Sequence, residues 1–177
     1  MLSEPISYEA RLPLEWQYLQ NPPDAKQIAL SQENNLECLK QAILLDELAN
    51  VSIDDNAIES SDVSRTEKKL DLLLSLVSVL IEKQKTSDLI TPIKLTSDTI
   101  EWECGEVTAS GLLALQVFIH SGSLTPMQLY CEPVKILGNT CTAKLLYMND
   151  NVQELLEKYI FLTHRRKVAA EKKRLQE

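Results

Sequence analysis

Glycine and histidine are both scarce in this sequence, and their scarcity excludes several kinds of catalytic site. The four glycines are scattered over 177 residues, so no glycine-rich loop is available to cradle a phosphate group. The two histidines, His120 and His164, have no cysteine or carboxylate at the spacing that metal ligands need. The pair Asp54-Asp55 lies in a polar connection that cannot hold the rigid geometry of acid–base catalysis. We therefore expect no catalytic residue, no metal and no cofactor.

Closely spaced cysteines are also absent. Cys38, Cys104, Cys131 and Cys141 form no Cys-x-x-Cys pair, and the first residues lack the basic start and apolar stretch of a signal peptide. We therefore interpret these four as reduced, buried thiols of a cytoplasmic protein. No membrane span is expected, because the longest apolar stretch, 70–81, has twelve residues, whereas a span needs about 20.

Positive charge is sparse except at the C-terminal end. The chain carries a formal net charge of −8, yet residues 161–177 contain six cations and only two carboxylates. The remaining residues therefore form a strongly acidic body, which repels a polyanion. This distribution argues against DNA as a partner.

Periodic patterns divide the chain into segments. Residues 6–20 alternate with a period of two, which predicts a first strand, and Pro13 within it favours an edge position. Residues 31–86 are predicted to form inserted helices. The first of them covers 31–48, a polar connection follows, and Ser64 opens the second with a Ser-x-x-Glu capping box.

The second inserted helix carries a seven-residue repeat. The repeat places aliphatic residues at its a and d positions, namely Val63, Leu70, Leu73, Val77 and Leu80. Further apolar stripes flank this seam, so the helix is apolar on more sides than one neighbouring helix can cover. We predict self-association through these residues. The alternative is that the seam packs only against the 31–48 helix of the same chain.

Residues 88–148 contain several short strand patterns separated by turns, which predicts a small antiparallel barrel. The Gly-Asn pair at 138–139 is a favourable hairpin turn, and Pro133 indicates a bulge or an edge. A last helix is expected over 150–177, and its end should project or fray because its apolar face fades beyond Thr163. The predicted fold class is α+β: a small antiparallel β-barrel with a helical, coiled-coil-like insertion after the first strand and a C-terminal helix.

Four stretches, taken in order, are similar to those of a known family. Residues 95–102 (LTSDTIEW) and 155–166 (LLEKYIFLTHRR) resemble the turn-plus-strand and the closing helix of the PilZ domain, a small barrel of bacterial cyclic di-GMP signalling. Residues 8–16 (YEARLPLEW) and 68–74 (KKLDLLL) are similar to the atypical PilZ subfamily. The resemblance implies one atypical PilZ domain over 1–177, with heptad helices that assemble the protein into tetramers.

The chain departs from the family at the residues that usually bind cyclic di-GMP. An ordinary PilZ receptor has an Arg-x-x-x-Arg pair before the barrel and an Asp/Asn-x-Ser-x-x-Gly turn within it. Here Arg11 is followed four residues later by Glu15, and the turn has Lys94, Thr96 and Thr99 at its signature positions. Guanidinium groups fork to phosphates, and each such charged hydrogen bond contributes about 1.5–3 kcal/mol. We therefore expect cyclic di-GMP binding to be weak or absent.

The leading interpretation is a non-catalytic regulatory protein of cyclic di-GMP signalling that self-associates and binds protein partners. The alternative is a direct receptor with a nonstandard site, in which Arg165, Arg166 and Lys167 would be the natural phosphate contacts. On local grounds these three are more simply a solvated basic helix end that complements the helix dipole. Binding of an acidic surface or an anionic membrane by the same basic helix is a weaker third reading, since the tail has no large aromatic residue beyond Phe161.

Overall fold

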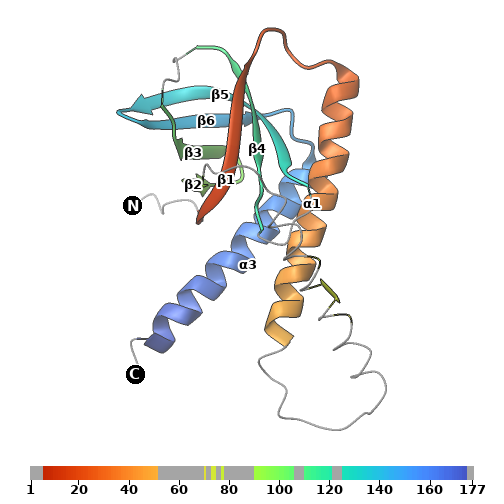
Figure 1. Cartoon of the computed structure of the whole chain (residues 1–177), viewed down its shortest axis with the longest axis vertical. Helices are drawn as coiled ribbons and strands as arrows, with labels where there is room; N and C mark the ends of the chain where they lie inside the picture. Colours follow the sequence, from red (N-terminus) through yellow and green to blue (C-terminus); the bar gives the residue numbers. More distant parts are fainter. Residues whose placement is uncertain are drawn as a thin grey trace.

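The computed structural model describes residues 6–51, 70, 73–74, 77, 90–105, 110–120 and 125–174. The elements named within them are, in chain order, β1 (Tyr8–Leu19), α1 (Ala25–Val51), β2 (Ile90–Leu95), β3 (Thr99–Glu103), β4 (Leu112–Val117), β5 (Met127–Leu137), β6 (Thr140–Leu146) and α3 (Asp150–Arg174). The strands close into one antiparallel barrel in the order β1-β2-β3-β6-β5-β4, with α1 and α3 packed beside it (Figure 1). This architecture confirms the predicted fold class.

β1 is long and pairs with two different strands along its length. Its first half pairs with β2, ending at Pro13 opposite Ile90, and its second half pairs with β4, starting at Leu14 opposite Val117. The edge position expected for Pro13 is therefore wrong, because a closed barrel has no edge. The proline, which has no N–H, stands instead where the strand changes partner, and its carbonyl accepts a hydrogen bond from the Phe118 N–H at 3.3 Å.

The β5–β6 hairpin follows the sequence pattern closely. Its turn is Gly138-Asn139, and Gly138 has a φ of +58°, a left-handed conformation that glycine adopts without steric cost. The register shifts between Pro133 and Lys135, which is the bulge that Pro133 indicated. The bulge lets β5 bend around the barrel wall.

The core fills the barrel and continues under the two helices. The largest fully buried side chains include Trp102, Leu113, Leu115 and Leu129 from the strands and Leu39 and Tyr159 from α1 and α3. Tyr159 holds α3 to the barrel, because its hydroxyl donates to the carbonyl of Ile119 at 2.8 Å and its ring meets that of Tyr8 edge-on. The hydroxyl of Tyr8, on β1, donates to the same carbonyl at 3.1 Å. Burial raises the pKa of both phenols, so both stay protonated donors.

Side-chain caps mark the starts of α1 and α3. In α1, Asp24 and Gln27 form a reciprocal capping box, with N–H to side-chain oxygen distances of 2.9 and 2.7 Å. The helix therefore begins at Ala25, earlier than the predicted start at residue 31. In α3, Asn149 caps the Val152 N–H at 2.9 Å, and the helix continues to Arg174, so its end projects as regular helix. Among the described residues no helix is both long and apolar enough to cross a membrane.

Candidate functional site

The β2–β3 hairpin contains three of the positions at which the sequence departs from the ordinary receptor, Lys94, Thr96 and Thr99. Thr96 is only 5% exposed, and its Oγ1 lies 2.8 Å from Asp98 Oδ1 and 2.7 Å from Thr99 Oγ1. The same oxygen accepts the Thr99 N–H at 2.9 Å. The hydroxyl groups of Thr96 and Thr99 are thus hydrogen-bonded to one another inside the turn, instead of pointing toward a ligand.

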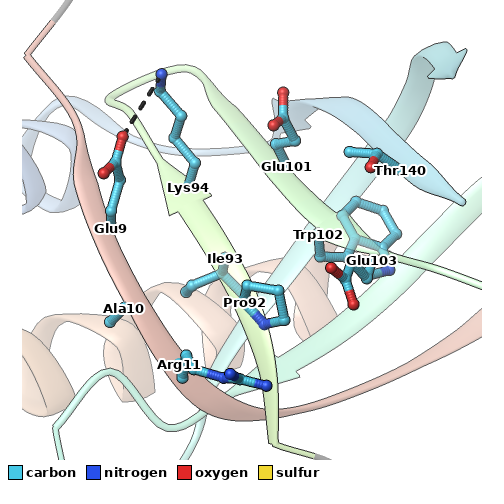
Figure 2. A pocket seen from close by; sticks show the side chains of 10 residues that line it. All are labelled: Glu9, Ala10, Arg11, Pro92, Ile93, Lys94, Glu101, Trp102, Glu103 and Thr140. Atoms are coloured by element: carbon cyan, nitrogen blue, oxygen red, sulfur yellow. Dashed lines mark ion pairs between the residues drawn. The ribbon is translucent and has the colours of Figure 1, made fainter.

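Along the strands that this turn joins, the outer barrel wall has an open hollow of about 560 Å³, here called the barrel groove. Its lining comes from β1, β2 and β3 and the start of β6: Glu9, Ala10, Arg11, Pro92, Ile93, Lys94, Glu101, Trp102, Glu103 and Thr140 (Figure 2). Register explains the grouping, because Glu9 lies opposite Lys94, and Lys94 lies opposite Glu101. Residues on three strands therefore share one outward face.

The lining of the barrel groove contains one more carboxylate than cations. Three carboxylates, from Glu9, Glu101 and Glu103, face two cations, from Arg11 and Lys94. Lys94 Nζ lies 3.7 Å from a Glu9 oxygen, and Glu101 accepts a hydrogen bond from the Thr142 hydroxyl at 3.2 Å. Lys167 lies 3.2 Å from Glu9 and balances the third carboxylate, so a dianionic dinucleotide placed here would meet no excess of positive charge to favour its binding.

The three basic residues Arg165, Arg166 and Lys167 of α3 have different surroundings. Arg166 forms an ion pair with Asp46 of α1, and both side chains are less than one third exposed. Lys167 contacts Glu9 of β1 at 3.2 Å. Arg165 is exposed. The structure therefore directs two of the three proposed phosphate contacts to carboxylates of two different elements, α1 and β1.

Glu9 connects β2 to the C-terminal helix, because its carboxylate contacts both Lys94 of β2 and Lys167 of α3. The hydrogen bond and the charge of Lys167 lower the pKa of this carboxyl group below its ordinary value. Sequence reasoning did not single out Glu9, Glu101, Glu103 or Asp46. The period-two alternation of the strands would have placed the three glutamates on the outer wall, although it would not have shown that they meet.

The predicted seam residues can be followed only in part. Leu70, Leu73 and Val77 are helical, with exposed fractions of 53%, 58% and 45%. Val63 and Leu80 lie outside the described residues. The side chains that the structure describes are thus not covered by α1 in the single chain.

The four cysteines are free and buried, as expected. Burial raises the pKa of Cys131 to about 12 and that of Cys141 to about 11. Such thiols are protonated at neutral pH and are poor nucleophiles. Within the described part of the chain, no group of three or more histidine, cysteine or acidic side chains is arranged to hold a metal ion.

A closed six-stranded antiparallel barrel with a helix inserted after its first strand and a second helix closing the chain defines the class as a PilZ-type domain. The sequence profile described as "Atypical PilZ domain, cyclic di-GMP receptor" matches residues 39–174, and the chain belongs to this family. The comparison with curated proteins gave no match.

A solved structure from Xanthomonas campestris is similar in fold, with a TM-score of 0.67 and 18% sequence identity. The alignment covers 95% of this chain and 93% of that chain. That protein is described as a pathogenic protein with a new tetrameric PilZ domain, self-assembled via an unusual helical bundle. At this identity the likeness concerns the fold.

Proposed function

We propose that this chain is a non-catalytic regulatory protein of bacterial cyclic di-GMP signalling that acts by self-association and by binding protein partners, and that its PilZ-type site binds the dinucleotide weakly or not at all. The family match supports the signalling context. The observation that carries the proposal is the closed β2–β3 turn, in which Thr96 and Thr99 bond to each other beside a groove bearing three carboxylates.

The proposed loss of binding has two physical causes. An incoming phosphate would have to break hydrogen bonds of the nearly buried Thr96 hydroxyl, and each bond broken without replacement opposes binding by about 1–3 kcal/mol. It would also have to displace Lys94 from Glu9, after which the carboxylate would remain facing the ligand. The charges of Lys94, Arg11 and Lys167 only balance the three glutamates and leave no excess of positive charge for a phosphate.

Self-association is proposed through the heptad helix, as a tetramer. The support is the exposure of Leu70, Leu73 and Val77, because three large aliphatic side chains in two helical turns are unfavourable in water. The similar protein from Xanthomonas campestris is described as tetrameric through a helical bundle.

Light scattering on purified protein tests the self-association. The wild type should have the mass of a tetramer, and Leu73→Glu should shift it toward the monomer. Val134→Glu is the matched control, since Val134 is an aliphatic residue on the barrel that is 68% exposed, and this variant should keep the wild-type mass. A monomeric wild type would refute the proposed self-association, and a Leu73→Glu variant that stays tetrameric would refute the proposed seam.

The second candidate is a direct receptor of cyclic di-GMP, which the family description favours. Its site would use Arg165, exposed on α3, together with Lys167. A fluorescence anisotropy titration with labelled dinucleotide separates the two candidates. Saturable binding that is lost in Arg165→Gln and Lys167→Gln would favour the receptor, whereas our proposal expects no saturation for the wild type or either variant.

A further inference from the structure

One face of α3 is left uncovered by the rest of the fold. The C-terminal half of the helix runs away from the barrel (Figure 1). Its inner side is used, since Arg166 reaches α1 and Lys167 reaches β1. On the outer side Phe161 is 52% exposed, and Glu157 and Lys172 are also exposed. Helical geometry places these residues in one stripe, because spacings of four, seven and eleven residues return to the same side of a helix.

The stripe, here called the α3 outer face, consists of Glu157, Phe161, Val168 and Lys172. Its charge changes sign along its length: it is acidic toward the start of the helix, apolar in the middle and basic toward the end. A second helix laid antiparallel along it would meet opposite charge at both ends. A face with this order is complementary to itself, which is what a two-fold symmetric contact requires.

A hollow beside the acidic end adds an independent feature. It measures about 490 Å³ and lies between α3, the residues just before β1 and the β2–β3 turn, with Ile6 and Phe161 as its exposed apolar lining and Glu154, Glu157 and Lys158 as its charged lining, which is acidic on balance. Ile6 is 48% exposed. The occupant that suits this hollow is a small apolar side chain followed by a cation, which is the order of Val168 and Lys172 in the chain's own helix.

We propose that α3 is a second docking surface, whose partner is α3 of a second copy of this chain, packed antiparallel. Glu157 of each copy then faces Lys172 of the other, and Phe161 faces Val168. Both pairs are centred between residues 164 and 165, so one two-fold axis satisfies both. The contact uses none of residues 63–80 and goes beyond the self-association proposed above.

The proposed contact is small. A stable complex commonly buries about 800 Å² on each partner, and one face of a helix over little more than four turns provides less. The contact should therefore be weak by itself and is best detected by covalent trapping. The buried native cysteines give a low background for that purpose.

The test is disulfide cross-linking of the full chain carrying Phe161→Cys and Val168→Cys together, followed by non-reducing gel electrophoresis. The antiparallel register predicts a covalent dimer. Phe161→Cys alone should not link, because the two copies of residue 161 would be offset by about 10 Å along the axis and a disulfide needs Cα atoms within about 7 Å. Ala170→Cys, exposed on the opposite side of α3, is the control for random collision.

Charge reversal then tests the pairing itself. In the double-cysteine chain, Glu157→Lys or Lys172→Glu should each slow linking by about two- to tenfold, and the two together should restore it. Linking should also persist when Leu73→Glu is added, which separates this contact from the heptad seam. The proposal is overturned if the double-cysteine chain does not link, if Phe161→Cys alone or Ala170→Cys links as fast, or if the paired reversal does not recover the rate.

Discussion

Replacing Thr96 by valine is the sharpest probe of the closed turn. Valine keeps the shape of the side chain but removes Oγ1, which accepts the Thr99 N–H at 2.9 Å and lies 2.8 Å from Asp98 Oδ1. Thr96 is 5% exposed, so water cannot easily replace the lost partner. A neutral hydrogen bond contributes about 1 kcal/mol and one to a charged group about 1.5–3 kcal/mol, so the change should cost about 2–4 kcal/mol of unfolding free energy.

Thermal and urea unfolding measure this cost. For a chain of this size, 1 kcal/mol corresponds to about 2–4 °C in Tm, so Thr96→Val should unfold about 4–16 °C below the wild type. Ser97→Ala in the same turn is the control and should change Tm little. All samples must be compared at one protein concentration, because association would contribute to the measured stability. A Tm within 1 °C of the wild type, with an unchanged urea m-value, would refute the account of the turn.

Three further predictions concern the helix contacts and the thiols. Arg166→Ala should lower the unfolding free energy by about 1–2 kcal/mol, because it removes the ion pair with the largely buried Asp46 carboxylate, whereas Arg165→Ala should stay within about 0.5 kcal/mol in the same urea titration. In an NMR titration the pKa of Glu9 should lie below the ordinary glutamate value, and it should rise back toward that value in Lys167→Ala. Because the pKa of Glu9 is lower in the folded state, the Glu9–Lys167 pair stabilises the fold at neutral pH, and this stabilisation is lost as the pH falls through the folded-state pKa. A colorimetric thiol reagent at pH 8 should label none of the four buried cysteines quickly until denaturant is added, and rapid labelling of the native chain would contradict their placement in the core.

Much of the fold could be predicted from the sequence because its signals are local. Alternation located the strands, Gly138 located the hairpin turn, and Pro133 located the bulge. The two errors also have local causes. The start of α1 was placed too late because its capping residue, Asp24, precedes the apolar periodicity by several residues. Pro13 was assigned to an edge because a single strand pattern cannot show that two neighbours share one strand.

The site was less accessible to sequence reasoning because it depends on register and on long-range pairing. The sequence located Lys94, Thr96 and Thr99, but the bonds within the turn follow from its backbone conformation. Glu9 meets Lys167 across a separation of 158 residues. No local pattern encodes such a contact, and an isolated glutamate on a strand is most simply interpreted as solvated charge.

The most direct test of the central claim is a calorimetric titration of the wild-type chain with cyclic di-GMP at moderate salt, with an ordinary PilZ receptor as the positive control. We expect no detectable heat of binding up to high micromolar ligand, because the Thr96–Thr99 turn is closed and the barrel groove has no excess of positive charge. Saturable binding at low micromolar concentration would contradict it and would show that the barrel binds the dinucleotide through a nonstandard site.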